Sequence, residues 1–173
     1  MDGETSTAST VNVVLLIART KVINHFAGEY FFLSNFYPCR VAFYGMCFPS
    51  VEAAFQAAKC ATPNDRVQFL NLAANQAKRR GRQIKMRPDW EDRKLTIMHN
   101  LLVHKFSENP DLIPKLLATG GAVLVEGNPW HDTYWGCCNC SRCGGRRGRN
   151  NLGRLLMELR ADYMASYKED GRT

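Results

Sequence analysis

Glu52, Gln56 and Lys59 have the types and spacing in this sequence that best suit chemistry. Separations of four and three residues place them on one face of a predicted helix. Glu52 and Lys59 are two turns, or about 10 Å, apart along the helix axis. We therefore expect no direct ion pair between them, but one ligand lying along the helix could contact both. A carboxylate can exchange protons or stabilise a cationic sugar centre, and a lysine in a partly dry pocket can attack an opened sugar aldehyde. The alternatives are a first-turn acid that suits the helix dipole and a solvated lysine.

A second candidate is the aromatic segment from Trp130 to Gly136, which also contains His131 and Asp132. Tryptophan and tyrosine rings offer flat faces for a base, and Asp132 supplies a second carboxylate. His131 has a side chain that titrates near neutral pH. The alternative is an aromatic corner packed on the core. Trp90, beside Asp89 at a helix start, is open to the same two interpretations.

Positive charge is concentrated in two blocks. The chain carries 23 Lys and Arg against 16 Asp and Glu, a formal charge of +7. Such blocks attract phosphate through their field and through guanidinium hydrogen bonds, although a solvated helix face has the same composition. The members are Lys78, Arg79, Arg80, Arg82, Lys85 and Arg87 in the first block, and Arg142, Arg146, Arg147, Arg149 and Arg154 in the second.

Four of the seven cysteines form the pattern C-C-x-C-x-x-C, namely Cys137, Cys138, Cys140 and Cys143. Four thiolates can hold a structural zinc ion, but paired C-x-x-C knuckles are missing and one short loop wraps a metal poorly. We therefore favour free thiols and expect no bound metal. The odd number of cysteines argues against a secreted disulfide scaffold and for a reducing compartment.

Helices and one hairpin are the elements that must position these residues. Alternating apolar residues and Gly45 predict a hairpin at Cys39–Phe48, followed by an alanine-rich helix over Val51–Cys60 with Ser50 as its N-cap. A further helix is predicted from about Asp65 to Arg80, and Gly81 ends it. Three more are predicted from Pro88-Asp89 through Phe106, from Asn109-Pro110 to near Gly120, and from about Asn151 to Met164. Ala122–Val125 reads as a strand and Gly136–Arg149 as a loop. The predicted class is α+β, a mostly helical single domain with a small β component.

Length and composition agree with this class. The chain of 173 residues suits one domain, and no run of 18 apolar residues predicts a membrane span. Met1–Thr10 is small, polar and predicted to be disordered, whereas Val13–Ala18 resembles a strand or a buried arm and lacks the basic leader of a secretory signal. We expect an intracellular protein, cytoplasmic or nuclear.

The chain resembles the NADAR (YbiA-like) family over about Asn24 to Arg160. Several blocks carry the resemblance in order: Glu29–Phe36, Phe48–Lys59, Lys85–Trp90, Leu117–Gly120, Asp132–Gly136 and Gly148–Met157. The implied organisation is a variable, partly disordered N-terminal arm at 1–22, the NADAR domain at 23–165 and a C-terminal tail at 166–173. The cysteine loop departs from members in which this loop lacks cysteine.

The resemblance implies N-glycosidase activity without a cofactor. Glu52, Lys59 and Asp132 are the expected catalytic residues, and Trp90 and Trp135 also match positions held to be functional. The expected substrate-binding residues are Asn35, Phe36, Gln56, Arg87, Trp90, Trp135, Gly136, Asn150 and Arg154. Some members act on early riboflavin-biosynthesis intermediates, and others remove ADP-ribose from guanine.

The basic surplus favours a partner that is nucleic acid carrying ADP-ribosylated guanine over a small ribosyl-phosphate substrate. The chemistry would be divided between Glu52 and Asp132, or would pass through a Schiff base on Lys59. A non-catalytic module that binds ADP-ribose or nucleic acid is the alternative of another class, and carboxylates in the site count against it because they repel phosphate. No membrane partner is expected, and the sequence leaves the oligomeric state open.

Overall fold

The computed structural model describes residues 21–143 and 148–169, and its class is the predicted one, α+β and mostly helical. The expectations for Met1–Thr10 and Val13–Ala18 lie outside these residues. The α-helices are α1 (Val51–Ala58), α2 (Ala74–Arg80), α3 (Trp90–Glu108), α4 (Leu112–Ala118) and α5 (Asn151–Glu169), and the 3₁₀ helices are η1 (Gly28–Leu33), η2 (Asn64–Phe69) and η3 (Ser141–Cys143). In the described ranges no helix is both long and apolar enough to cross a bilayer.

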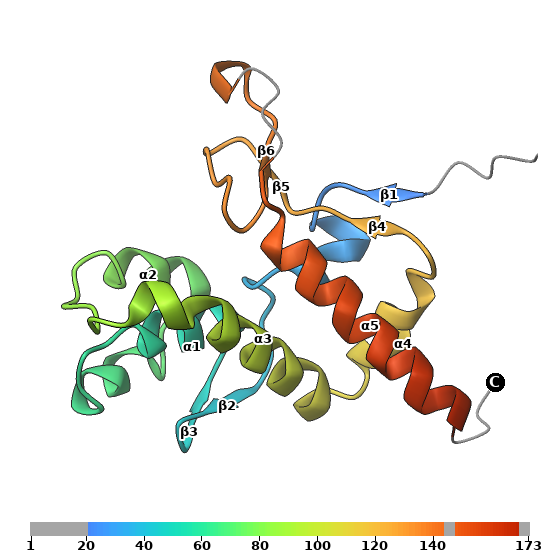
Figure 1. The fold of residues 1–173 in the computed structure, drawn as a ribbon. Coiled ribbons are helices and arrows are strands. Elements are labelled where there is room, and N and C mark those ends of the chain that lie inside the picture. The colour runs from blue at the N-terminus through green and yellow to red at the C-terminus, as the bar shows by residue number, and fades with distance from the viewer. Residues whose placement is uncertain (1–20, 144–147, 170–173) are drawn as a thin grey trace, which may run out of the picture.

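In the part of the chain that the structure describes, six short strands form three two-stranded sheets. They are β1 (Val22–Ile23), β2 (Val41–Phe43), β3 (Met46–Phe48), β4 (Val123–Leu124), β5 (Gly127–Asn128) and β6 (Cys137–Cys138). The β1–β4 and β5–β6 pairs are parallel, whereas β2 and β3 form the predicted antiparallel hairpin. The long helices α3 and α5 cross the molecule, and the sheets lie at its periphery (Figure 1). The helices therefore form the body of the fold.

Helix α1 lies in the core, and all eight of its residues are buried. Its four alanines present little side-chain volume, which lets α2 and α3 pack closely against it. Ser50 caps the helix as predicted, because its hydroxyl accepts a 3.1 Å hydrogen bond from the amide of Ala53. A cap of this kind stabilises a helix by about 1 kcal/mol. The chemistry-bearing residues of α1 are thus held on a rigid, buried element.

The predicted helix from Asp65 to Arg80 is wrong as a single element. The chain instead forms η2, turns after Phe69 and restarts as α2. Phe69 is fully buried, and the apolar residues that follow it do not keep a helical period. The side chain of Gln76 accepts a hydrogen bond from the amide of Ala73 at the new helix start. At the other end of the chain, α5 continues past Met164 to Glu169.

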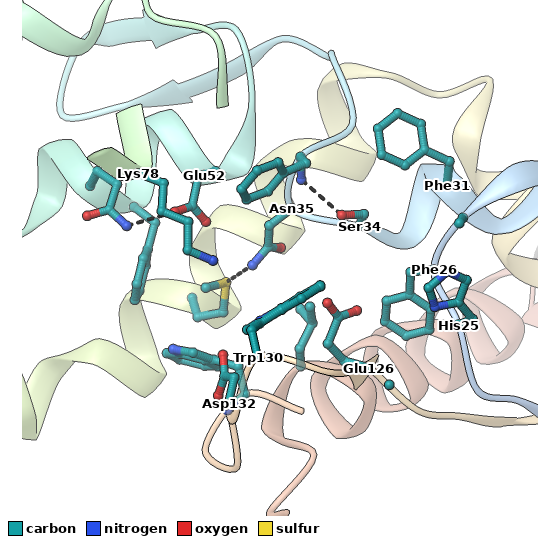
Figure 2. A pocket seen from close by; sticks show the side chains of 18 of the residues that line it. His25, Phe26, Phe31, Ser34, Asn35, Glu52, Lys78, Glu126, Trp130 and Asp132 are labelled. Carbon is teal, nitrogen blue, oxygen red and sulfur yellow. Dashed lines mark hydrogen bonds between the residues drawn. The ribbon is translucent and has the colours of Figure 1, made fainter. Parts of the chain in front are cut away.

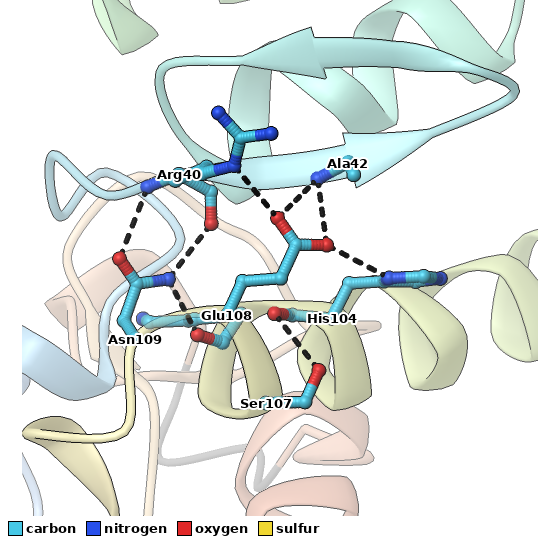
Figure 3. Close-up of polar contacts among 7 residues, drawn as sticks. Arg40, Ala42, His104, Ser107, Glu108 and Asn109 are labelled. Atoms are coloured by element: carbon cyan, nitrogen blue, oxygen red, sulfur yellow. Dashed lines mark hydrogen bonds and ion pairs between the residues drawn. The ribbon is translucent and has the colours of Figure 1, made fainter.

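The β2–β3 hairpin is fastened to the end of α3 by Glu108 and Asn109 (Figure 3). Both carboxylate oxygens of Glu108 accept from the amide of Ala42, at 3.1 and 3.0 Å, and Oε1 also lies 3.0 Å from His104 Nδ1. The Asn109 amide donates to the carbonyls of Arg40 and Lys105. These bonds satisfy backbone groups at the end of α3 and fix the hairpin that precedes α1.

Candidate active site

A cavity of about 610 Å³ lies between α1, α2, the segment from η1 to Phe36, and the segment from Glu126 to Trp135. Figure 2 shows Glu52 and Asn35 pointing into it from one side, and Asp132, Trp130 and Glu126 from the other. The cavity is lined by His25, Phe26, Ala27, Phe31, Ser34, Asn35, Phe36, Glu52, Phe55, Gln56, Lys59, Lys78, Met98, Glu126, Gly127, Trp130, Asp132, Trp135 and Leu152. The two predicted acids and the predicted lysine therefore share one cavity.

Glu52 lies in the first turn of α1 with only 6% of its surface exposed. Burial raises the pKa of its carboxyl, and the hydrogen bond from Gln56 and the charges of Lys78 and Lys59 partly oppose this rise. The Gln56 amide nitrogen donates to Glu52 Oε1 at 2.7 Å. A buried carboxyl with a raised pKa suits proton transfer to a leaving group.

The position of the Gln56 side chain depends on Gly81, the residue that follows α2. A Cβ atom at Gly81 would lie 1.8 Å from Gln56 Oε1, so only glycine allows this approach. Gly81 has ordinary right-handed backbone angles, and its requirement is therefore space rather than conformational freedom. The end of α2 thus sets the side chain that orients Glu52.

Lys59 caps the C-terminal end of α1, and its carbonyl accepts a 2.8 Å hydrogen bond from the amide of Arg87. Its ammonium group lies 5.5 Å from the ring centre of Phe55 and 5.6 Å from that of Trp90. Burial lowers the pKa of Lys59, and the nearby Glu52 charge partly offsets this effect. A lowered pKa increases the fraction of neutral amine, which is the nucleophilic form.

Asp132 is held by a short loop that Asn128 closes. The fully buried Asn128 side chain accepts from the amide of Asp132 at 3.0 Å and donates to its carbonyl at 2.8 Å. Asp132 Oδ1 in turn accepts from the amides of Tyr134 and Trp135, at 3.0 and 2.8 Å. These four bonds fix the orientation of the carboxylate before any ligand binds.

Glu126 is a cavity residue that the sequence reasoning missed. It lies two residues after the end of β4, and burial together with the charge of Asp132 raises its pKa to about 7. The amide of Glu126 donates to Asn150 Oδ1 at 3.0 Å, which anchors its backbone. An acid placed immediately after the apolar stretch Ala122–Val125 was the available signal. A carboxyl that titrates near neutral pH is suited to acid–base catalysis.

Unpaired acceptors point to a polar ligand. Among residues 21–143 and 148–169, four buried side-chain polar atoms have no hydrogen-bond partner, and three of them belong to cavity residues: Asn35 Oδ1, Gln56 Oε1 and Glu126 Oε2. Each buried group left without a partner costs about 1–3 kcal/mol. A ligand with several donors, such as sugar hydroxyls or a base amide, would recover this cost at Asn35 and Glu126, whereas Gln56 Oε1 lies against Gly81.

Asn35 is placed by α3. Lys105 is fully buried, and its ammonium group donates a 2.8 Å hydrogen bond to the carbonyl of Ser34. Asn35 itself donates to Met98 Sδ at 3.5 Å, and its carbonyl accepts from the amide of Glu52 at 2.9 Å. The predicted binding residue Asn35 is therefore tied to both α1 and α3.

Aromatic rings border the cavity beside Lys78 of α2. The Lys78 ammonium group lies 5.2 Å from the ring centre of Phe36 and 5.8 Å from that of Trp130. Trp130 remains 56% exposed, which is unusual for a tryptophan and suits a stacking surface that a base can reach. Trp135 also lines the cavity, but its ring packs edge-on against Phe55, with centres 5.3 Å apart.

Several residues predicted to bind substrate do not line the cavity. Trp90 is only 5% exposed and packs edge-on against Phe55, which favours the core interpretation of this ring over a stacking surface. The Arg87 guanidinium pairs with Asp89 at 2.6 Å. Asn150 bonds the backbone of Leu124 and Glu126, and Gly136 packs on the Glu126 carbonyl. Arg154 is exposed on α5, and Arg146 and Arg147 lie outside the described residues.

The sequence and the fold were compared with those of known protein families. The model of the NADAR domain matches residues 23–163. The chain belongs to the NADAR domain family. An N-glycosidase, YbiA, of Escherichia coli is 34% identical over 149 residues, which cover 83% of this chain and 89% of the relative. The NMR structure of the E. coli protein YbiA superposes with a TM-score of 0.74 at 33% identity, covering 86% of this chain and 88% of that one.

A second kind of NADAR relative is a longer protein. A riboflavin biosynthesis protein of Vibrio vulnificus is 37% identical over 134 residues, which are 76% of this chain but 35% of the relative. The chain thus spans about a third of that protein. Within the NADAR fold, the cavity joins Glu52 of α1 and Lys59 at its C-cap to Asp132 on the far loop, as predicted. It also includes Lys78 of the first basic block and Trp130 of the aromatic segment, and it adds Glu126.

Proposed function

We propose that the protein is an N-glycosidase that releases ADP-ribose from guanine bases of nucleic acid. The observation that carries the proposal is the group of three carboxyls, Glu52, Glu126 and Asp132, facing one cavity. In the reaction, the bond from the anomeric carbon to the base nitrogen breaks and water adds to that carbon. The base leaves with a proton, and the water loses one.

The charge of the site suits the transition state of this reaction. Breaking an N-glycosidic bond places positive charge on the sugar ring, and preorganised carboxylates stabilise it. Asp132 raises the pKa of both Glu52 and Glu126 through its charge, so proximity favours a mixture of ionised and protonated carboxyls. A site that only bound phosphate would gain nothing from three acids. This argues for catalysis over a binding module.

The two predicted acids take different tasks. Glu52 is the more buried, and in its protonated form it donates to the departing nitrogen. Asp132, whose orientation four hydrogen bonds fix, supports the sugar cation and receives the proton of the attacking water. Glu126 lies in the same cavity with a pKa near 7 and can serve either step.

A covalent variant of the mechanism uses Lys59. The lowered pKa of its amine supports attack on the anomeric carbon, with the base leaving and a Schiff base forming on the opened sugar. Water then hydrolyses the imine and returns the free lysine. Borohydride added during turnover should reduce that imine to a stable adduct on Lys59. If no adduct forms while product accumulates, the direct hydrolytic route holds.

The cavity border favours a base that is part of a larger molecule. Trp130 is exposed beside Lys78, so a base can stack from outside while its sugar enters the cavity. The adjoining Arg79 and Arg80 of α2 add positive charge next to Lys78. The riboflavin-related names of some relatives support the alternative substrate, a ribosylamino-pyrimidine phosphate.

The deciding experiment supplies both candidate substrates to the purified chain. ADP-ribosylated guanine in DNA should yield free ADP-ribose and restored guanine, followed by chromatography and mass spectrometry. The ribosylamino-pyrimidine phosphate should yield little ribose phosphate. Turnover of the pyrimidine alone would replace the nucleic-acid substrate with the riboflavin-type one. Turnover of neither, with tight binding of ADP-ribose, would remove the enzymatic function.

A further inference from the structure

We propose that His131, Cys138, Cys140 and Cys143 bind one Zn²⁺ ion that positions the Asp132 loop. Their ligand atoms, one ring nitrogen and three sulfurs, all lie within 4.8 Å of one another. These residues come from two separate segments, the loop after β5 and the segment that begins in β6. The site is distinct from the catalytic cavity and goes beyond the proposed function.

The spacing of the atoms fits a tetrahedral ion. His131 Nδ1 lies 3.1 Å from Cys143 Sγ, 3.3 Å from Cys140 Sγ and 3.8 Å from Cys138 Sγ. Zinc bonds of about 2.0 Å to nitrogen and 2.3 Å to sulfur place tetrahedral ligand atoms roughly 3.5–3.8 Å apart. One histidine with three cysteines is a common structural zinc set, and softer thiolate ligands favour zinc over magnesium or calcium.

The cluster differs in one member from the four-cysteine set considered from the sequence. Cys137 and Cys138 are consecutive residues of β6, and consecutive strand residues point to opposite faces. Cys138 faces the cluster, whereas the Cys137 thiol donates to the carbonyl of Gly148 at 3.6 Å. His131 supplies the fourth ligand instead. The objection that one short loop cannot wrap a metal is removed, because the ligands come from two segments.

The backbone at His131 supports this assignment. His131 has φ = 66°, in the left-handed region that non-glycine residues rarely adopt. This conformation costs about 1–2 kcal/mol unless surrounding contacts offset it. It turns the imidazole towards the three sulfurs, and metal coordination is the kind of contact that offsets the cost. The segment from β6 through η3 projects from the helical body in Figure 1, so little other packing holds it.

The site has a direct structural link to the cavity. His131 lies between Trp130 and Asp132, and both neighbours line the cavity. An ion bound at His131 therefore fixes this loop from one side, while Asn128 fixes it from the other. Four protein ligands leave no open position for water or substrate, so the ion is structural and His131 is a positioning residue.

The first test measures the metal content of the purified full chain by elemental mass spectrometry. We expect one Zn²⁺ per chain, and chelation followed by Co²⁺ addition should give the visible and near-ultraviolet bands of tetrahedral cobalt with thiolate ligands. Cys140→Ser and His131→Asn should lose the ion. Asparagine tolerates left-handed backbone, so the second variant separates ligand loss from backbone strain.

Cys137→Ser is the matched control, because it changes a cysteine of the same loop outside the cluster. It should keep the full metal content and cobalt spectrum. The proposal is overturned if wild-type protein holds no zinc and takes up no Co²⁺, if an intramolecular disulfide joins the cluster cysteines, or if Cys137→Ser loses metal as Cys140→Ser does. These readouts need no substrate, so they stand apart from the test of N-glycosidase activity.

Discussion

Gln56 donates a 2.7 Å hydrogen bond to the buried carboxylate of Glu52, and the missing side chain of Gly81 leaves the space that Gln56 occupies. This relationship joins α1 to the end of α2 at the point where the proposed general acid lies. It also makes the chemistry sensitive to a residue that does not line the cavity.

Glu52→Gln should abolish most turnover without unfolding the protein. The amide keeps the size of the side chain but cannot donate a catalytic proton as a carboxyl does, so kcat should fall about 10²–10⁴-fold. Burial raises the pKa of Glu52, which means that the folded protein bears a cost for its charge at neutral pH. The thermal midpoint at neutral pH should therefore stay or rise. Unchanged turnover would remove Glu52 from the reaction.

Gly81→Ala should lower activity through Gln56. The new Cβ would overlap Gln56 Oε1, so this side chain must move and Glu52 loses its hydrogen-bond donor. We expect kcat to fall about tenfold, the effect of a lost positioning hydrogen bond of roughly 1–1.5 kcal/mol. Gly121→Ala is the control, since a Cβ there meets no atom within 4 Å. Equal activity in the two variants would show that Gln56 does not position the acid.

Glu126→Gln should change how stability depends on pH. The folded-state pKa of Glu126 is raised from 4.5 to about 7, so the folded protein binds the proton more tightly than the unfolded chain. Wild-type stability should therefore fall as pH rises from about 4.5 to 7, by on the order of 3 kcal/mol from this group. The variant should lack this decline and be the more stable protein at about pH 8, with little difference at about pH 4. Urea titrations of both proteins at the two pH values measure their free energies of unfolding. The same change in this free energy between about pH 4 and about pH 8 in the two proteins would contradict the prediction.

Trp130→Ala should weaken substrate binding with little loss of stability. Its ring is 56% exposed beside Lys78, so truncation removes a stacking surface rather than core packing. We expect KM for the guanine substrate to rise about tenfold, since one stacked base contributes roughly 1–3 kcal/mol. Trp90→Ala is the comparison, because that ring is buried and its loss should cost about 3–5 kcal/mol of stability. Unaltered KM in Trp130→Ala would exclude stacking at this ring.

Much of the fold was predictable from local pattern. The Ser50 cap, the hairpin turn and the long helix after Asp89 depend on residues within a few positions of one another, and each was confirmed. The helix predicted from Asp65 to Arg80 failed because burial of Phe69 by distant residues interrupts it. Periodicity alone does not reveal such a break.

The candidate site divides in the same way. The shared helix face of Glu52, Gln56 and Lys59 follows from the period of a helix. Asp132 was a candidate as the second carboxylate of the aromatic segment, and the family resemblance supplied its expected catalytic role. Trp90 was ambiguous from sequence because an aromatic ring at a helix start suits either the core or a ligand. Its packing on Phe55 favours the core. Glu126 became a candidate only once the segment after β4 was placed, and placing the loop after β5 put Trp130 of the candidate aromatic segment at the cavity.

By itself, the sequence determined the class of the fold, the helix that carries the central acid and the family to which the chain belongs. Only the tertiary structure decided which distant groups share the cavity, that Glu126 titrates near neutral pH, and that His131 rather than Cys137 faces the other three cysteines. The physical reason is the distance along the sequence over which each kind of interaction acts. Helix period and capping act over a few residues, whereas burial, electrostatic coupling and ligand convergence depend on segments that only folding brings together.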